Sequence, residues 1–278
     1  MNRLLAAVVQ TNGGPDVGAN LDSVERLVRR AAARGATLIA VPENFAFVGD
    51  GTPAADVRRL EIAETLPAGG PIVERMAALA RDTKATLVLG AMPEKAVSDP
   101  ARAHNTSVVL SPEGAVVACY RKIHLFDVSF ENGPVIQESK SIAPGEAKPL
   151  LARLPGVALG LSICYDLRFP ELYRALALEG AEAFVIPAAF TLHTGKDHWS
   201  VLLRARAIEN TAYVLAPAQW GSHPGGRQTW GKSMIVDPWG ETIAVASEGE
   251  GIAVAELDPD VLARVRRALP TLQHVRLK

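Results

Sequence analysis

The chain has 278 residues, of which 48% are hydrophobic and 21% charged, and its formal net charge is −1 at pH 7. A chain of this length can bury a sizeable core, and we expect a single domain over residues 1–278. Lysine and arginine are scattered along the sequence and do not outnumber the acidic residues. The charge pattern therefore argues against nucleic acid or an anionic membrane as a partner.

The cellular compartment is predicted from the N-terminus and the cysteines. The apolar run from Leu4 to Val9 is too short for a signal peptide, and no stretch approaches the length of a membrane span. Two cysteines, Cys119 and Cys164, cannot form a disulfide framework. We therefore expect a protein of the reducing cytoplasm.

Buried strands alternate with helices along the first half of the chain. Apolar runs predict strands at 4–9, 38–41 and 86–89, and apolar positions at helical spacing predict helices over 21–35 and 72–80. A hairpin follows, with strands 106–110 and 115–120 joined at a turn that contains Pro112 and Gly114. This order is typical of a layered α/β domain.

The second half repeats this order. One constant offset carries 86–93 onto 212–219, 71–85 onto 197–211 and 111–114 onto 237–240. Two similar halves predict two sheets packed face to face with helices outside, which is a four-layer α-β-β-α sandwich. The alternative is chance similarity between ordinary α/β segments.

The two halves differ where their strands end. The first has Pro42-Glu43 where the second has Pro187-Ala188, and the second has Cys164 where the first has Gln10. Ligands of α/β proteins gather outside the carboxyl ends of strands. One reactive group from each half therefore predicts a single site at the junction.

Cys164 is the candidate nucleophile. It follows the apolar run 157–163 and precedes a helical pattern that opens at Pro170. A thiol between a strand and a helix N-terminus faces conditions that favour the thiolate. A buried structural cysteine is the alternative, since free cysteines are among the most buried residues. We assign that structural role to Cys119, which lies on a predicted strand.

Glu43 and Lys122 are candidate partners of this thiol. Glu43 lies between apolar residues, which should raise the pKa of its carboxyl and suit it to general-base catalysis. Lys122 ends the second hairpin strand, where its ammonium would lower the pKa of a nearby thiol and stabilise an oxyanion. The alternatives are a turn glutamate and a solvated lysine.

Three ordered motifs together resemble the nitrilase, or carbon–nitrogen hydrolase, superfamily. They are Pro42-Glu43-Asn44, Tyr120-Arg121-Lys122-Ile123-His124-Leu125 and the run from Gly160 through Cys164 to Glu171. The resemblance implies that Glu43, Lys122 and Cys164 form the catalytic triad, and that Glu138 orients the lysine. It also implies the four-layer sandwich and a homodimer or larger homo-oligomer.

The resemblance implies covalent amide hydrolysis. Glu43 would take the thiol proton as Cys164 attacks the amide carbon, and Lys122 with the backbone N–H of Tyr165 would stabilise the oxyanion. Hydrolysis of the thioester would then release the acid. This chemistry needs no metal and no organic cofactor. His193 and His198 lie five residues apart, which does not place them on one helix face as a metal pair.

The motifs are similar to the branch of the superfamily that acts on deaminated glutathione or on ω-amides of keto acids. We expect a small acid amide as the substrate, first of all deaminated glutathione, as in metabolite repair. The candidate substrate-binding residues are the strand-end Phe190 and Thr191, His193 in the following loop, and Arg227.

Three alternatives to that substrate remain open. An ω-amidase acting on 2-oxo-acid amides is the first, because Trp230 and Lys232 depart from the pattern of the branch and could reshape the pocket. Another amidase or carbamoylase of the superfamily is the second. A catalytically inactive scaffold with the same fold is the third, and an intact set of Glu43, Lys122 and Cys164 argues against it.

Overall fold

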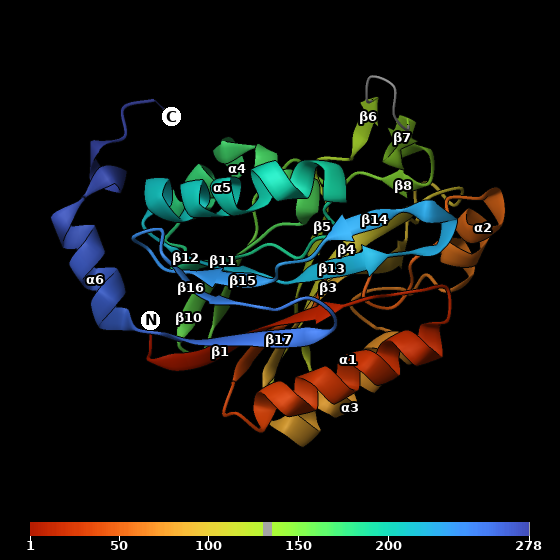
Figure 1. The fold of residues 1–278 in the computed structure, drawn as a ribbon, viewed down its shortest axis with the longest axis horizontal. Coiled ribbons are helices and arrows are strands. Elements are labelled where there is room, and N and C mark those ends of the chain that lie inside the picture. The colour runs from red at the N-terminus through yellow and green to blue at the C-terminus, as the bar shows by residue number, and fades with distance from the viewer. Residues whose placement is uncertain (130–134, 278) are drawn as a thin grey trace.

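The computed structural model describes residues 1–129 and 135–277 and has two large β-sheets that face one another (Figure 1). The first sheet runs in the order β14-β13-β1-β2-β3-β4-β5, while β17 also pairs with β1 and β8 with β4. Its strands are β1 (Leu4–Thr11), β2 (Leu38–Ala40), β3 (Thr86–Lys95), β4 (Ala103–Leu110), β5 (Val116–Arg121), β8 (Ile142–Ala143), β13 (Ala218–Ser222), β14 (Gln228–Trp230) and β17 (Gly251–Leu257).

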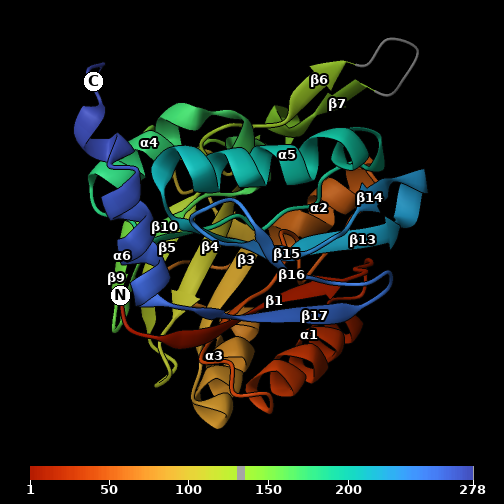
Figure 2. The same ribbon diagram turned by 60° about the vertical axis from the view of Figure 1, so that its left-hand side comes forward.

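The second sheet runs in the order β16-β15-β12-β11-β10-β9. Its strands are β9 (Leu151–Leu154), β10 (Val157–Leu161), β11 (Ala183–Val185), β12 (Tyr213–Ala216), β15 (Met234–Val236) and β16 (Thr242–Val245). A small separate ribbon pairs β6 (Asp127–Ser129) with β7 (Val135–Gln137) and projects beyond the end of α5 in Figure 2.

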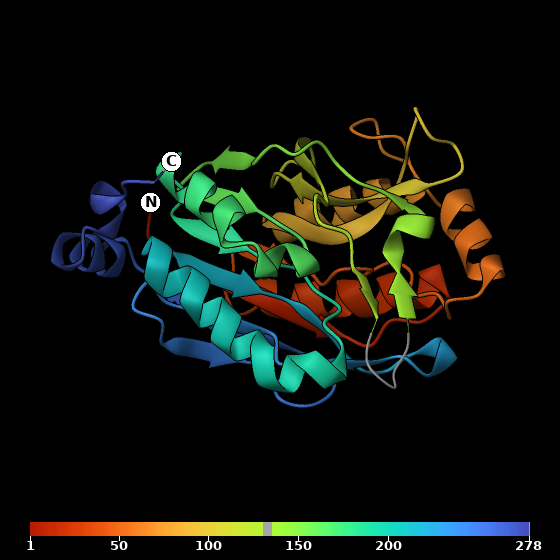
Figure 3. The same ribbon diagram turned by 90° about the horizontal axis from the view of Figure 1, so that it is seen from above.

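Helices cover the outer face of each sheet, so the predicted four-layer α-β-β-α sandwich is confirmed. Figure 2 shows α1 (Val17–Ala32) and α3 (Pro71–Thr83) below the first sheet, and α4 (Pro170–Leu178) and α5 (Leu192–Asn210) above the second. Figure 3, seen from above, shows α4 and α5 lying over the second sheet, with α2 (Pro53–Glu61) and α6 (Pro259–Ala268) at opposite ends of the molecule.

The predicted internal repeat is present in the strand topology. The strands β1, β2 and β3 are parallel and β4 and β5 continue antiparallel. The strands β10, β11 and β12 are likewise parallel, and β15 and β16 continue antiparallel. Each half thus carries its reactive loops at the carboxyl ends of its parallel strands, where a shared site can form.

The alternation of side chains along β1 explains the layering. Ala6 and Val8 are fully buried in the core between the two sheets. Ala7 and Val9 are fully buried in the second core, beneath α1 and α3. Successive strand residues point to opposite faces, so a continuous apolar run packs against both layers. Apolar burial on both faces is the main stabilising contribution to this arrangement.

The segment after β11 differs from its prediction as a loop. His193 lies in the first turn of α5, because the Thr191 side chain accepts a hydrogen bond from the backbone N–H of Thr194 at 3.4 Å and caps the helix there. The helix α2, which was not predicted from the sequence, has no fully buried residue. Among the residues that the structure describes, no helix is long and apolar enough to cross a membrane.

Candidate active site

Cys164 opens a short 3-10 helix, Cys164–Arg168, immediately after β10. Its φ of 48° lies in the left-handed region, which costs a non-glycine residue about 1–2 kcal/mol. Its backbone N–H donates to the carbonyl of Pro187 at 2.9 Å. The sharp turn is closed by Ile163 and Asp166, whose backbone and side-chain groups bond one another reciprocally at 3.0 and 2.9 Å. The thiol is thereby held at the end of the strand.

Glu43 follows the strand β2 and is 2% exposed. Its carboxylate accepts hydrogen bonds from the backbone N–H of Ala189 at 2.8 Å and from Asn105 Nδ2 at 3.0 Å. Gly90 on β3 allows the backbone before Glu43 to approach closely, since a Cβ at that position would lie 2.0 Å from the carbonyl oxygen of Pro42. The donors fix the direction of the carboxylate without occupying all of its acceptor sites.

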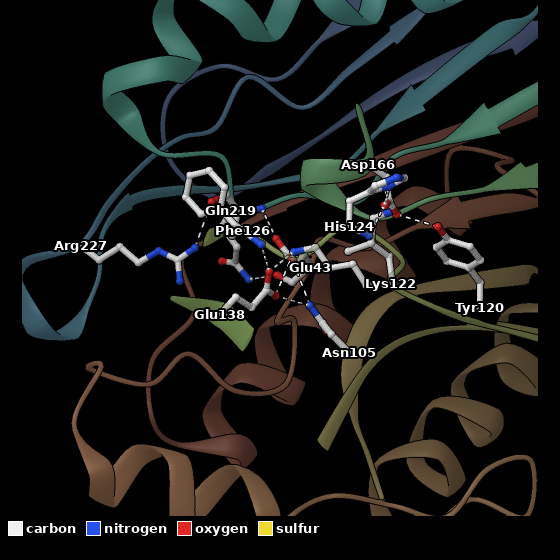
Figure 4. A network of polar contacts seen from close by, with 12 residues as sticks. Glu43, Asn105, Tyr120, Lys122, His124, Phe126, Glu138, Asp166, Gln219 and Arg227 are labelled. Atoms are coloured by element: carbon white, nitrogen blue, oxygen red, sulfur yellow. Dashed lines mark hydrogen bonds and ion pairs between the residues drawn. The ribbon is translucent and has the colours of Figure 1, made fainter. Parts of the chain in front are cut away.

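Lys122 lies between two carboxylates (Figure 4). Its Nζ is 3.0 Å from Glu43 Oε1 and 2.8 Å from Glu138 Oε2, and its side chain is 2% exposed. Glu138 opens a 3-10 helix, Glu138–Lys140, and also accepts the backbone N–H of Phe126 at 2.7 Å. A buried ammonium requires such pairing, because an uncompensated charge would be strongly destabilising.

The protonation states of these groups differ from the sequence-based expectation. Burial by itself would raise the pKa of Glu43, but the Lys122 ammonium and a hydrogen bond from Cys164 outweigh it, and the pKa is lowered. Burial and the charge of Glu43 raise the pKa of the Cys164 thiol well above its usual value, against the opposing effect of Lys122. The expectations of a raised pKa for Glu43 and a favoured thiolate were therefore wrong.

The resulting ground state is a neutral thiol beside an ionised carboxylate. Burial alone would lower the pKa of Lys122, but Glu138 and Glu43 raise it well above its usual value, so the lysine stays charged. The sequence predicted both a cation and a carboxylate beside the thiol, but not that the charge of Glu43 would outweigh that of Lys122 and keep the thiol protonated. A carboxylate that accepts a hydrogen bond from a thiol can take its proton as the sulfur attacks.

These groups open onto a cavity of about 1170 Å³. Glu43, Lys122, Glu138 and Cys164 line it together, although they come from four separate segments. The other predicted residues, Tyr165, Phe190, Thr191, His193 and Arg227, line it too. Trp230 and Lys232 are not among its described lining residues; a Cβ on Gly195 would meet the Cβ of Trp230 at 2.3 Å, so this tryptophan packs under the start of α5.

The structure adds residues that sequence reasoning missed. Asn105 bonds Glu43, and its carbonyl accepts the backbone N–H of Lys122 at 2.9 Å. Arg168 lines the cavity and lies over the ring of Phe190, with 5.1 Å from its Cζ to the ring centroid. Asn105 sits on a strand with no distinctive pattern. Arg168 lies within the cysteine motif, and its place four residues after Cys164 was a usable signal.

Metal binding has no obvious place in the described parts of the chain. Within residues 1–129 and 135–277, no group of three or more His, Cys, Asp or Glu side chains could hold a metal ion. His193 and His198 both lie on α5, and His198 Nδ1 is 3.3 Å from Arg168 Nη1.

Comparisons with known proteins show the family of this chain. The family model described as carbon–nitrogen hydrolase matches residues 5–267. The chain is 43% identical over 275 residues to a protein of Synechocystis sp. named deaminated glutathione amidase, covering 99% of this chain and 98% of the relative.

Two solved structures are also similar. One is Saccharomyces cerevisiae Nit3, a member of branch 10 of the nitrilase superfamily, with a TM-score of 0.85, 33% identity, and coverage of 96% of this chain and 94% of that one. The other is a mutant of the amidase from Nesterenkonia sp. AN1 whose active-site cysteine carries acrylamide by Michael addition. Its TM-score is 0.76 at 29% identity, with coverage of 98% of this chain and 100% of that one.

The family model spans nearly the whole chain, and the Synechocystis relative matches it over its full length. Both findings show membership of the same family. The chain belongs to the carbon–nitrogen hydrolase family of the nitrilase superfamily and is an enzyme that hydrolyses carbon–nitrogen bonds.

Proposed function

We propose that this enzyme is an amidase that hydrolyses deaminated glutathione to 2-oxoglutarate and cysteinylglycine, with Cys164 as its nucleophile. The observation that carries the proposal is that one cavity is lined by the buried thiol of Cys164, by the carboxylate of Glu43 and by a lysine held between two carboxylates. The full-length similarity to the Synechocystis protein named deaminated glutathione amidase supports the substrate.

The reaction begins with acylation of the thiol. As Cys164 Sγ bonds to the amide carbon, Glu43 takes the sulfur proton, and the Lys122 ammonium with the backbone N–H of Tyr165 stabilises the oxyanion. The C–N bond then breaks, and Glu43 returns the proton to the leaving nitrogen. A thioester on Cys164 remains.

Deacylation uses the same groups. Glu43 takes a proton from water as the oxygen attacks the thioester carbon, and Lys122 again stabilises the oxyanion. The C–S bond breaks, the proton passes to sulfur, and the acid leaves. Glu138 holds Lys122 in place through both of its carboxylate oxygens, at 3.0 and 2.8 Å from Nζ.

The cavity suits a substrate with two carboxylates. Arg168 is anchored against the Phe190 and Tyr165 rings, close in sequence to the nucleophile. Arg227 donates to the carbonyl of Ala189 at 3.1 Å, and Ala189 in turn donates to Glu43. Guanidinium groups bind carboxylates bidentately, so these two arginines are the proposed anchors, with Thr191 and His193 at the start of α5 beside them.

The deciding measurement is the ratio of kcat/KM for deaminated glutathione over kcat/KM for 2-oxoglutaramate. We expect a ratio above one, because the cavity extends well beyond the volume that a small keto-acid amide fills. A ratio below one would make the enzyme an ω-amidase and leave the thiol chemistry unchanged. Arg227→Gln should raise KM, whereas Lys196→Gln, which alters a half-exposed cavity lysine, serves as the matched control.

We also propose one domain, a cytoplasmic location and a homodimer. The two halves share their sheets, since β13 and β17 from the second half pair with β1, which supports a single unit.

Both cysteines are free, as a reducing compartment favours. Val201 and Ile208 on α5 and Trp239 nearby are exposed apolar side chains that a second copy would cover. Light scattering on the purified protein tests the dimer.

A further inference from the structure

Asp166 is a fully buried carboxylate two residues after the catalytic cysteine, yet it does not line the cavity. Its two oxygens accept hydrogen bonds from Tyr120 Oη at 2.7 Å, from the backbone N–H of Ile163 at 2.9 Å and from the backbone N–H of His124 at 3.0 Å. His124 Nδ1 lies 2.7 Å from Oδ1. A buried carboxylate needs such donors, and here every one comes from a segment that carries a catalytic residue.

The partners of Asp166 flank the lysine and the cysteine. Tyr120 and His124 lie two residues before and two residues after Lys122, and Ile163 immediately precedes Cys164. Figure 4 shows Asp166 beside His124 and Tyr120, with Lys122 reaching away from them toward Glu43. The His124 ring also stacks on Phe169, just beyond the cysteine turn, with 3.6 Å between centroids. Two halves of the molecule are thus joined at one carboxylate.

We propose that Asp166 and Tyr120 are positioning residues that set the geometry between Lys122 and the thiol of Cys164. They act on the hydrolysis described above and so rest on the proposed function. Neither lines the cavity, so neither contacts substrate. Their hydrogen bonds hold the lysine segment of the first half against the strained turn of the second. A displacement of about 1 Å between reacting groups can cost about 10²-fold in rate.

The experiment compares two buried tyrosines that each lose one hydroxyl. Tyr120→Phe removes the bond to Asp166, while the matched control Tyr173→Phe removes a bond of 2.9 Å to Ser162 Oγ, which has no part in holding Asp166. We expect Tyr120→Phe to lower kcat about tenfold, with KM and the melting temperature close to those of Tyr173→Phe. Asp166→Asn should lower kcat further, by about 10²-fold.

A second readout needs no substrate. The rate at which iodoacetamide alkylates Cys164 depends on proton transfer from the thiol, so it should fall in Tyr120→Phe and stay unchanged in Tyr173→Phe. Failure of the wild type to hydrolyse deaminated glutathione would refute the proposed substrate, and the alkylation comparison would still test the positioning role. Equal kcat and equal alkylation rates in the two tyrosine variants would overturn it.

Discussion

Two acid–cation pairs have adjacent cations, Arg121 at the end of β5 and Lys122 just after it, but their acids come from different segments and their surroundings differ. Arg121 pairs with Glu94, whose carboxylate it contacts at 2.7 and 2.5 Å, and Thr106 donates to the same carboxylate at 2.7 Å. Lys122 pairs with Glu43, and Asn105 donates to that carboxylate. Thr106 is the cross-strand partner of Arg121, and the carbonyl of Asn105 accepts the backbone N–H of Lys122. The donor and the cation of one pair are therefore adjacent in sequence to the donor and the cation of the other.

Successive residues of a strand point to opposite faces, so the two pairs reach different environments. Glu94, Thr106 and Arg121 do not line the cavity, and the Arg121 side chain is 44% exposed. Lys122 is buried, faces a second carboxylate and has the thiol beside it. The comparison teaches that a buried acid–base pair becomes reactive through what lies against it. The Glu94 pair satisfies its own charges, whereas the Glu43 pair also lies beside the thiol that we propose as the nucleophile.

Removing the thiol should have the largest effect. Cys164→Ala should lower kcat by at least ~10³-fold, because covalent catalysis loses its nucleophile. The fold should persist, since the change deletes one sulfur from a site that is already open to a cavity. Ammonia or amine release is the assay, with circular dichroism as the control for folding. Undiminished release, once contaminating enzyme is excluded, would rule out Cys164.

The pair beside the thiol should act as a unit. Glu43→Gln and Lys122→Ala should each lower kcat by about 10²–10⁴-fold, and the double variant should be hardly worse than either, since cooperating groups lose activity non-additively. A double-mutant cycle on kcat/KM measures this. Losses that simply multiply would mean that the two residues act independently.

The pH dependence of kcat/KM tests the charges that distinguish the Glu43 pair from the Glu94 pair. With the pKa of Glu43 lowered and those of Cys164 and Lys122 raised, kcat/KM should be level from about pH 5 to pH 8. It should fall only as the pH drops through the low pKa of Glu43. The contribution of Glu43 to stability follows the same sign: it is complete above the pKa of an unfolded glutamate and is lost as pH falls through the folded value. An acidic limb between pH 6 and pH 7, in a pH–rate profile, would contradict this assignment.

The neighbouring pair should barely affect the reaction. Arg121→Ala should leave kcat/KM within about twofold, because it lies outside the cavity, while the free energy of unfolding falls by about 1–3 kcal/mol as buried Glu94 loses donors. Chemical denaturation measures the free energy of unfolding, and steady-state kinetics measure kcat/KM. A loss comparable with that of Lys122→Ala would show that the two pairs are coupled.

A chelator should have no effect at all. In the proposed mechanism the positive charge that stabilises the oxyanion is the Lys122 ammonium, which is held by two carboxylates. Activity after dialysis against EDTA should therefore equal that of the untreated enzyme, with a zinc-dependent hydrolase as the positive control. If EDTA abolished activity and added metal restored it, a metal ion and not Lys122 would be the group that stabilises the oxyanion.

The sequence by itself determined the strands, the outer helices and the repeat, because buried strands and amphipathic helices leave apolar patterns of their own period. It also proposed Glu43, Lys122 and Cys164, which stand at the ends of predicted strands, and Glu138 through the family resemblance, and all four line one cavity. The expected loop at His193 was wrong because a single side-chain cap at Thr191 extends α5.

Only the tertiary structure decided the charges of the site. Local apolar neighbours predicted a raised pKa for Glu43, but the ammonium that lowers it comes from a residue 79 positions away. Other contacts of the site also join residues that are distant in sequence. They are the bond of Asn105 to Glu43, the bond of Tyr120 to Asp166, and the packing of Arg168 over Phe190. Electrostatic interactions depend on distance in space and on burial, and a local pattern of residues predicts neither quantity.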